Sequence, residues 1–246
     1  MQISIITVCF NSADTIEKTI NSVVNQNYKD LEYIIIDGGS TDGTLDIVEK
    51  YKDKISLVIS EPDNGIYDAM NKGIRLASGD VIGILNSDDF YSHNQVLDSV
   101  ADSFQDRDTE VVYSNLTYVD RQDVTKKVRY WKAGSYEEKK LDYGWIPPHP
   151  TCFIRKEVYQ KYGQFNLDFH IAADYELLLR FLKKGLKIKY LDMDLVCMRT
   201  GGASGRNLSQ RWNGWQELRK AWDTNNLVRP KFFVTKRILH KIKQYL

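Results

Sequence analysis

Cysteine is scarce, and no two of the cysteines are close together. The 246 residues include three, Cys9, Cys152 and Cys197, an odd number without a C-x-x-C pair. This spacing indicates neither a zinc knuckle nor a disulfide framework. Free thiols in a reducing compartment are therefore expected.

Long hydrophobic runs are also missing. No stretch approaches the ~20 uninterrupted apolar residues that a membrane-spanning helix needs. Residues 1–5 lack the basic region, apolar core and small-residue cleavage site of a signal peptide. We expect a cytoplasmic protein, with peripheral contact on the cytoplasmic face of a membrane left open.

The glycine-rich loops of common nucleotide-binding folds are absent. The turn after the first apolar run, residues 9–13, contains no glycine, so the G-x-G-x-x-G fingerprint is missing. There is no G-x-x-x-x-G-K-[ST] loop either. These absences argue against a dinucleotide-binding Rossmann domain and a P-loop hydrolase.

Acidic residues are absent from the end of the chain. Six basic residues and no acidic residue follow Asp223, so with a net charge of +1 the preceding residues sum to −5. The overall balance gives no reason to expect nucleic acid. The asymmetry points to an anionic partner for the tail.

What is present is a βαβ pattern in the first 90 residues. Apolar runs of strand length alternate with segments of helical periodicity. Strands are predicted at 3–10, 32–36, 55–60 and 80–85, and helices at 13–26, 45–51 and 66–77. This alternation predicts an α/β protein with a parallel sheet and right-handed crossovers.

Polar clusters follow three of these strands. They are Asn11-Ser12, residues 37–42 and residues 86–89. In parallel sheets ligands bind beyond the carboxyl ends of the strands. We expect the three clusters to converge into a ligand or metal site.

The third cluster ends in the adjacent acids Asp88 and Asp89, with no Lys or Arg within several residues. Two carboxylates at the end of a buried strand repel each other unless they are solvated or hold a cation. The alternative is that one of them caps the following helix.

The second half is more mixed. Strands are predicted at 110–113, 116–120, 124–131, 149–154 and 186–191, helices at 96–104, 156–162, 174–184 and 209–222, and a loop at 132–148. No internal repeat or low-complexity linker appears, so one continuous domain, 1–246, is predicted.

Taken together, five motifs resemble the family 2 glycosyltransferases of the GT-A fold. They are residues 3–11, 36–44, Asn64-Gly65 with 71–73, 77–80 and 85–89. The second half is similar more loosely, through His149-Pro150 and residues 173–176, to bacterial O-antigen and capsule transferases. The resemblance implies a Rossmann-like, mostly parallel sheet flanked by helices, with a mixed acceptor-side half and C-terminal helices.

The resemblance also implies an activity. A nucleoside-diphosphate sugar, expected to be a UDP-sugar, would be the donor, with Mn²⁺ or Mg²⁺ and inverting transfer. The acceptor would be a saccharide or a polyprenyl-diphosphate-linked saccharide of surface polysaccharide biosynthesis. Residues 1–100 would bind the donor, 101–228 would form the acceptor and catalytic half, and 229–246 a basic amphipathic tail.

Site residues follow from the matching motif positions. Asp174 would be the catalytic base, and Asp37 the acid that reads uracil. Val8 and Phe10 would line the nucleoside pocket. The remaining expected contacts are Gly65, Asn71 and Asp88 to the donor, and Asp89 with Asp88 to the metal, Asp89 being favoured for direct contact.

The sequence departs from the family pattern in three places. Asn86 replaces the first acid of the fuller D-x-D-D form, and Ala173 precedes the base where many relatives have Glu. Gln210-Arg211-Trp212 lacks the spacing of the Q-x-x-R-W box of processive synthases. A processive polymerase is therefore not predicted.

Several alternatives stay open. Asp174 is also placed to cap its helix, and His149 and His170 are as easily structural. The segment 200–205, followed by Arg206 and Arg211, is either a lid over the diphosphate or a surface loop. The tail 230–246 is either an interfacial helix on anionic lipid or a helix packed on the domain.

The Trp212, Trp215 and Trp222 group is interpreted as helix packing rather than a sugar platform.

Two other functions stay open. A sugar-nucleotide nucleotidyltransferase also uses an α/β sheet and acids, but its glycine-rich basic loop is absent. A noncatalytic sugar-binding module is the third possibility.

Overall fold

The computed structural model describes residues 1–201 and 208–242, and within these ranges the strands form a single mixed sheet. The strands are β1 (Ile3–Cys9), β2 (Leu31–Asp37), β3 (Leu57–Ser60), β4 (Val81–Asn86), β5 (Phe90–Tyr91), β6 (Val111–Val119), β7 (Lys127–Trp131), β8 (Phe153–Arg155) and β9 (Ile188–Arg199). Their order is β3-β2-β1-β4-β8-β6-β9-β5, with β7 paired to β6.

The helices lie between these strands along the chain. They are α1 (Ile16–Val24), α2 (Thr44–Glu49), α3 (Ile66–Leu76), α4 (Val96–Ser103), α5 (Lys156–Tyr162), α6 (Ala173–Leu182), α7 (Leu208–Thr224) and α8 (Phe233–Ile242). Three short 3₁₀ segments are also described: η1 (Lys52–Lys54), η2 (Glu138–Tyr143) and η3 (His149–Thr151).

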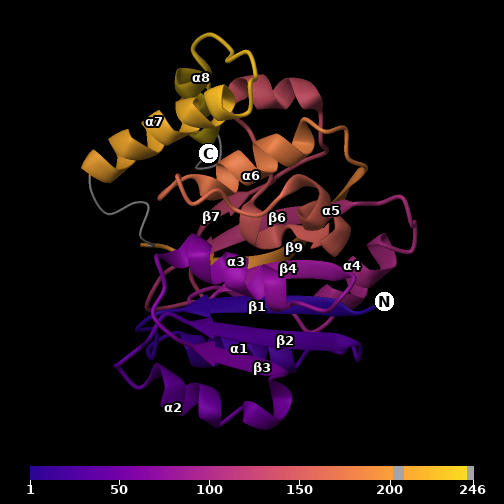
Figure 1. Cartoon of the computed structure of the whole chain (residues 1–246), viewed down its shortest axis with the longest axis vertical. Coiled ribbons are helices and arrows are strands. Elements are labelled where there is room, and N and C mark those ends of the chain that lie inside the picture. The colour runs from indigo at the N-terminus through magenta and orange to yellow at the C-terminus, as the bar shows by residue number, and fades with distance from the viewer. Residues whose placement is uncertain (202–207, 243–246) are drawn as a thin grey trace.

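The predicted βαβ series of the first half is confirmed. Strands β1, β2, β3 and β4 pair in parallel, and Ile6 of β1 lies opposite Ile34 of β2 on one side and Ile84 of β4 on the other. The carboxyl ends of β1, β2 and β4 therefore meet at one edge. Figure 1 shows these indigo and purple strands in the lower part of the molecule.

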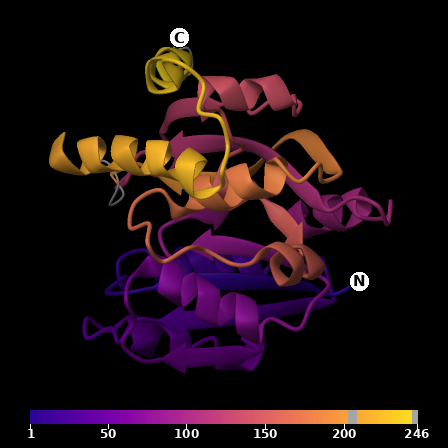
Figure 2. The ribbon, with the colours of Figure 1, turned by 45° about the horizontal axis from the view of Figure 1, so that its top comes forward.

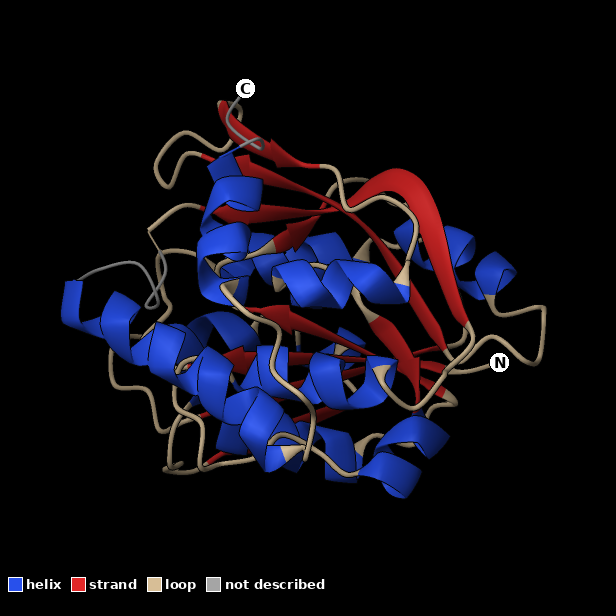
Figure 3. Ribbon diagram, turned by 90° about the horizontal axis from the view of Figure 1, so that it is seen from above, coloured by secondary structure: helices blue, strands red, loops and turns tan. Residues whose placement is uncertain are grey.

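The side chains of β1 belong to two different hydrophobic cores, one on each face of the sheet. Ile6 and Val8 belong to a core that contains residues of α3 and α6, whereas Ile3 and Ile5 belong to a second core with residues of α1 and α4. This alternation follows from the two-residue period of a strand. The sheet is thus covered by helices on both faces, as Figure 3 shows.

The second half departs from prediction at β6. Two strands were expected at 110–113 and 116–120, but one strand runs through. The polar residues in the middle do not break it because they are satisfied: the Asn115 side chain accepts hydrogen bonds from the Ala133 N–H and the Tyr190 hydroxyl and donates one to Asp192. A fully bonded polar side chain can be buried in a strand at little cost.

Three further boundaries were wrong. The expected strand 149–154 is the 3₁₀ turn η3 followed by β8, since Pro148 and Pro150 flank His149 and proline fixes the backbone and lacks a donor. The loop 132–148 contains η2, and β9 continues eight residues beyond the predicted end at 191, to Arg199.

The C-terminal helices gather over the second half. In Figures 1 and 2, α6, α7 and α8 lie at the end of the molecule away from β2 and β3. α6 packs against α7, and α8 packs against η2. Over the described ranges, no helix combines the length and apolarity needed to cross a bilayer.

Candidate functional site

The three polar clusters do converge at the carboxyl edge of the sheet. The Asn11 N–H donates to Ser40 Oγ at 2.8 Å, and Asn11 Oδ1 accepts the Thr41 N–H at 2.9 Å. The hydroxyls of Ser12 and Ser87 are 2.8 Å apart. Turns that follow three different strands are thus bonded into one rim.

Val8 and Phe10 lie on this rim in different environments. Val8 is buried, whereas the Phe10 ring is 62% exposed directly after β1. Asn11 then adopts a left-handed backbone, with φ of 47°, which Asn tolerates better than most residues. An exposed aromatic ring beside a polar rim is suited to stacking on a planar base.

Asp37, at the end of β2, has no exposed surface and no spare acceptor position. Its carboxylate accepts hydrogen bonds from the N–H groups of Gly39 and Ser40 and from the hydroxyls of Ser40 and Ser60. Burial acts to raise its pKa, but these hydrogen bonds outweigh burial and hold the pKa below the ordinary value. Asp37 therefore builds the turn.

Asp63 is the carboxylate beside this turn that keeps one oxygen, Oδ2, without a hydrogen bond from the described residues. A Cβ added to Gly38 would come within 2.5 Å of Asp63 Oδ2, so the Asp63 side chain fills the space that glycine leaves. Its Oδ1 accepts the Gly65 N–H at 2.8 Å. Gly65 has a φ of 107°, a conformation that favours glycine. The sequence motifs did not single out Asp63, although its position after the third predicted strand could have indicated it.

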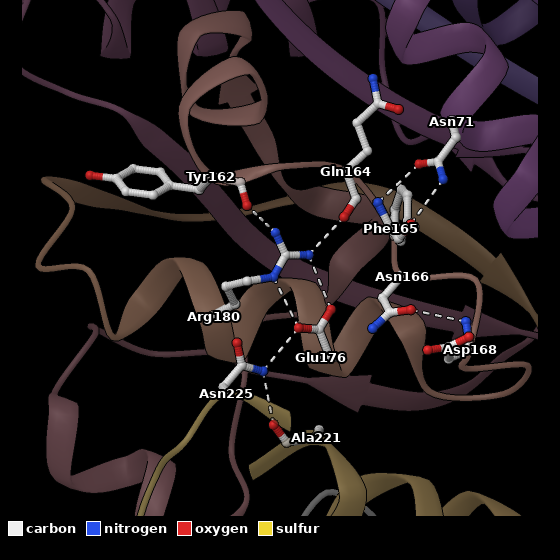
Figure 4. A network of polar contacts seen from close by, with 10 residues as sticks. All are labelled: Asn71, Tyr162, Gln164, Phe165, Asn166, Asp168, Glu176, Arg180, Ala221 and Asn225. Carbon is white, nitrogen blue, oxygen red and sulfur yellow. Dashed lines mark hydrogen bonds and ion pairs between the residues drawn. The ribbon is translucent and has the colours of Figure 1, made fainter. Parts of the chain in front are cut away.

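Asn71 lies on α3, and both groups of its side-chain amide are engaged within the protein. Nδ2 donates to the Phe165 carbonyl and Oδ1 accepts the Phe165 N–H, each at 2.9 Å. Figure 4 shows this pair of bonds. Asn71 joins α3 to the segment that leads to α6, a contact the sequence did not indicate.

The two adjacent acids differ in exposure. The Asp88 side chain is 29% exposed, whereas Asp89 is fully buried. Burial, and then the charge of Asp88, raise the pKa of Asp89 well above its ordinary value. Within the part of the chain that the structure describes, neither Asp89 Oδ1 nor Asn86 Oδ1 has a hydrogen-bond partner. Asp88 is consequently the carboxylate that a ligand can reach.

Cations do reach this acid pair, contrary to the expectation from neighbouring sequence. Arg199, buried at the end of β9, donates to the Asp88 carbonyl, and Arg121 Nη1 lies 3.8 Å from Asp88 Oδ2. Burial lowers the pKa of Arg199, and the charges of Asp88 and Asp89 oppose that shift. The sequence pattern did not indicate either arginine, because both lie far from the acid pair along the chain.

A divalent metal fits this arrangement only if the protein and the substrate coordinate it together. Among the described side chains, no group of three or more His, Cys, Asp or Glu residues is placed to hold a metal ion. The reachable Asp88 carboxylate and the unpartnered Asn86 and Asp89 oxygens are hard ligands of the type Mg²⁺ and Mn²⁺ prefer. Such ions commonly complete their coordination with substrate phosphates.

Asp174 lies in the first turn of α6 and does not cap it. The cap position is Ala172, which offers no side-chain hydrogen bond. Asp174 is half-buried, and its Oδ1 accepts the Tyr175 N–H at 2.8 Å. The helix-cap alternative is therefore wrong, and the second carboxylate oxygen accepts no hydrogen bond from the described residues.

Residues from distant parts of the chain surround Asp174. Burial lowers the pKa of His149, and the charge of Asp174 partly offsets this. Arg237 of α8 lies 5.0 Å over the Tyr175 ring and donates to the Gly144 carbonyl. Burial lowers the pKa of Arg237, which the Tyr175 and Asp174 charges oppose. The predicted tail thus contacts Tyr175, the residue next to the candidate base.

His149 should make stability depend on pH. The pKa of His149 in the folded protein lies below the ordinary value near 6.5. Just below that pH, His149 is therefore protonated in the unfolded chain and still neutral in the folded protein. We expect the free energy of unfolding to fall as pH drops below about 6.5, with a slope of at most ~1.4 kcal/mol per pH unit.

Urea unfolding between about pH 5 and about pH 8 measures this slope. His149→Asn should flatten it, whereas His93→Asn, at an exposed histidine, should not. Equal slopes in wild type and His149→Asn would contradict the assignment.

The tryptophans divide into two groups. Trp222 is buried, packs 6.1 Å from Phe233 and donates to the Tyr175 hydroxyl at 3.0 Å, so helix packing is confirmed there. Trp212 is 57% exposed and contacts Trp215 edge-on. The segment 200–205, either a lid or a surface loop, lies outside the described residues apart from Thr200 and Gly201, as do Arg206 and the Arg211 side chain.

Comparison with known proteins identifies the class. Residues 4–163 match the model of glycosyl transferase family 2. An uncharacterized glycosyltransferase of Mycobacterium tuberculosis (strain CDC 1551 / Oshkosh) is 33% identical over 186 residues, covering 72% of this chain and 68% of the relative. The chain belongs to glycosyl transferase family 2 and is a glycosyltransferase.

A second relative has a more specific name. The UDP-Glc:alpha-D-GlcNAc-diphosphoundecaprenol beta-1,3-glucosyltransferase WfaP of Escherichia coli is 31% identical over 193 residues, covering 76% of this chain and 72% of the relative. A third relative, named PGL/p-HBAD biosynthesis glycosyltransferase, of Mycobacterium bovis (strain BCG / Pasteur 1173P2), is 28% identical over 193 residues, covering 76% of this chain and 73% of the relative.

Solved structures confirm the GT-A fold. S. aureus TarS 1–349 in complex with UDP-GlcNAc superposes with a TM-score of 0.69 at 18% identity, covering all of this chain and 78% of that chain. The mannosyltransferase PcManGT of Pyrobaculum calidifontis, with GDP-Man and Mn²⁺, gives 0.68 at 19% identity, covering 97% and 70%.

Proposed function

We propose that this enzyme transfers a sugar, with inversion, from a UDP-sugar to a lipid-linked saccharide acceptor in surface polysaccharide biosynthesis, using a divalent metal. One contact carries the proposal. The Tyr67 hydroxyl, on the helix that starts at the donor rim, donates to the Ile171 carbonyl at 3.0 Å. It joins the donor edge to the segment that ends in Asp174. WfaP, named for a UDP-Glc donor and a diphosphoundecaprenol-linked acceptor, supports the same reading.

In this proposal Asp174 is the general base. Inversion requires a carboxylate that takes the proton of the acceptor hydroxyl as that oxygen attacks the anomeric carbon. The free oxygen of the half-buried Asp174 is suited to hold that proton. Negative charge develops meanwhile on the departing UDP, and Arg121 and Arg199 lie where cations would offset it.

Asp88 would hold the metal in preference to Asp89, a revision of the sequence-based assignment. Its side chain is partly exposed, while that of Asp89 is buried. When bound, Mg²⁺ or Mn²⁺ would act as a Lewis acid that neutralises the leaving diphosphate.

The nucleobase would lie between Phe10 and Asp63. Uracil presents an N–H donor on its pairing edge, which the free Asp63 carboxylate can accept, whereas Asp37 is saturated by its own turn. Val8 and Gly65 then shape the pocket wall. Asn71 acts through Phe165 rather than by touching the donor.

Titration calorimetry and product analysis test this function. UDP should bind more tightly with Mn²⁺ than without it, and CDP, which lacks the uracil N–H, should bind more weakly. A panel of nucleotide sugars should give UDP as product. Release of pyrophosphate from UTP and a sugar phosphate would indicate the nucleotidyltransferase alternative, and binding without turnover the noncatalytic one.

We also propose contact with the cytoplasmic face of a membrane, through the start of the predicted tail 230–246 and the neighbouring Val228. In α8, Phe233 is buried and Val234 packs on the core, so that face belongs to the domain. Val228 and Phe232 are 93% and 78% exposed, beside the exposed basic residue Lys231. Exposed apolar side chains among cations fit an anionic lipid surface.

The double substitution Val228→Ser with Phe232→Ser should weaken sedimentation with vesicles that contain phosphatidylserine by about tenfold, since burying one Phe is worth ~1.5–3 kcal/mol. Donor hydrolysis should be unchanged. Leu76→Ser, at an exposed leucine on α3, is the matched control. Unchanged sedimentation would contradict membrane contact. Deletion of 230–246 is not a clean test, because it removes Phe233, which packs on Trp222 of α7, and Arg237, which lies over Tyr175 of α6.

A further inference from the structure

Glu217 of α7 accepts three consecutive backbone N–H groups from the segment directly before Asp174. Its Oε1 lies 2.9 Å from the His170 nitrogen, and its Oε2 lies 2.9 Å from the Ile171 nitrogen and 2.7 Å from the Ala172 nitrogen. Hydrogen bonds to an ionised acceptor are roughly twice as strong as those between neutral groups. These contacts fix the three peptide groups that lead into α6.

The local sequence leaves the start of α6 without a side chain that could cap it. Residues 170–172 are His-Ile-Ala, and none of these is a Ser, Thr, Asp or Asn that could cap α6. The Ala172 cap position accordingly has no side-chain hydrogen bond. Glu217 accepts the N–H groups of residues 170–172, which precede the first turn of α6, and its negative charge is favourable beside a helix N-terminus.

Helix α7 also contacts residues 168–171, the earlier part of the segment that leads to Asp174. A Cβ added to Gly214 would meet Ile171 Cγ2 at 3.4 Å, so the helix passes close to the segment. One turn beyond Glu217, Lys220 donates to the Asp168 carbonyl at 3.0 Å, and its ammonium lies 4.8 Å over the Phe169 ring.

The start of the segment is held separately, by the network of Figure 4. Arg180 of α6 donates to the carbonyls of Tyr162 and Gln164 and pairs with the buried Glu176 at 2.9 Å. Asn225, just beyond α7, donates to the same carboxylate. Glu217 is therefore the charged group that acts on the residues next to the base, while Arg180 holds the distant end.

We propose that Glu217 is a positioning residue for Asp174. This inference rests on the proposed function, in which Asp174 is the base. Glu217 fixes residues 170–172 and so sets where the Asp174 carboxylate stands relative to the acceptor hydroxyl. Small errors in such placement are costly, since a displacement of about 1 Å can lower a rate by ~10²-fold.

Glu217→Gln tests the proposal with little change in shape. It removes the charge and presents an amide N–H₂ toward backbone donors. We expect kcat for sugar transfer to fall by about 10–100-fold, while the Kd for UDP with Mn²⁺ stays unchanged. Asp223→Asn removes an exposed carboxylate from the same helix and should match wild type in both measurements.

Hydrogen–deuterium exchange provides a readout that needs no substrate. Glu217→Gln should lose protection at the amides of residues 170–172 and keep it in the body of α6. Wild-type exchange at these amides, or an unchanged kcat despite lost protection, would overturn the proposal. If the wild-type protein transferred no sugar, the proposed function would be overturned instead. The exchange experiment would still show whether Glu217 fixes residues 170–172.

Discussion

Replacing Asp174 with Asn is expected to lower kcat for sugar transfer by about 10²–10⁴-fold, the range that a general base contributes. An amide cannot accept the proton of the acceptor hydroxyl. Asn keeps the size of the side chain and an oxygen that can still accept the Tyr175 N–H. The fold and the donor site should be preserved, so the Kd for UDP should not change.

Initial-rate kinetics of UDP release, with the donor found by the panel, measure this effect alongside calorimetry with UDP. Asp168→Asn is the control, because Asp168 is an exposed acid in the segment that leads to α6. Turnover of Asp174→Asn at the wild-type rate would show that the base is another residue. Loss of UDP binding together with turnover would point to a structural role instead.

Replacing Asp88 with Asn is expected to remove the dependence on Mn²⁺. The partly exposed carboxylate is the ligand a metal could reach, and a Lewis acid contributes several kcal/mol to charge stabilisation. We therefore expect a loss of ~10²-fold or more in metal-stimulated transfer. UDP affinity without metal should be unchanged, and the additional affinity that Mn²⁺ confers should disappear.

Asp89→Asn provides the matched comparison. Burial and the neighbouring Asp88 charge raise the pKa of Asp89, and Asn keeps the shape of its buried side chain. We expect Asp89→Asn to keep most of the Mn²⁺ response. A full loss in Asp89→Asn with a normal response in Asp88→Asn would restore the sequence-based preference for Asp89.

Much of the fold was predictable because its determinants are local. The period of apolar residues marked β1 to β4 and the helices between them, and parallel topology then placed the polar turns at one edge. The bonds from Asn11 to Ser40 and from Ser12 to Ser87 confirm that prediction. The second half was less predictable, since β6 and β9 depend on long-range pairing and on polar side chains satisfied by distant partners.

The sequence predicted the positions of the acidic residues in the candidate site better than it predicted their roles. Asp37, Asp88, Asp89 and Asp174 all lie at strand ends or at the start of a helix, as expected. Asp37, however, is saturated by its own turn, and the neighbouring Asp63 is the free carboxylate. Identical side chains thus differ in chemistry because hydrogen bonding and burial differ.

The sequence by itself determined the parallel sheet, the edge where the site lies and the family, since these follow from short-range periodicity and motif spacing. The tertiary structure alone decided which acids are exposed and which cations face them. Arg199 reaches Asp88 across 111 residues, and Glu217 reaches Ala172 across 45. Desolvation and pairing depend on these long-range contacts, which no local pattern encodes.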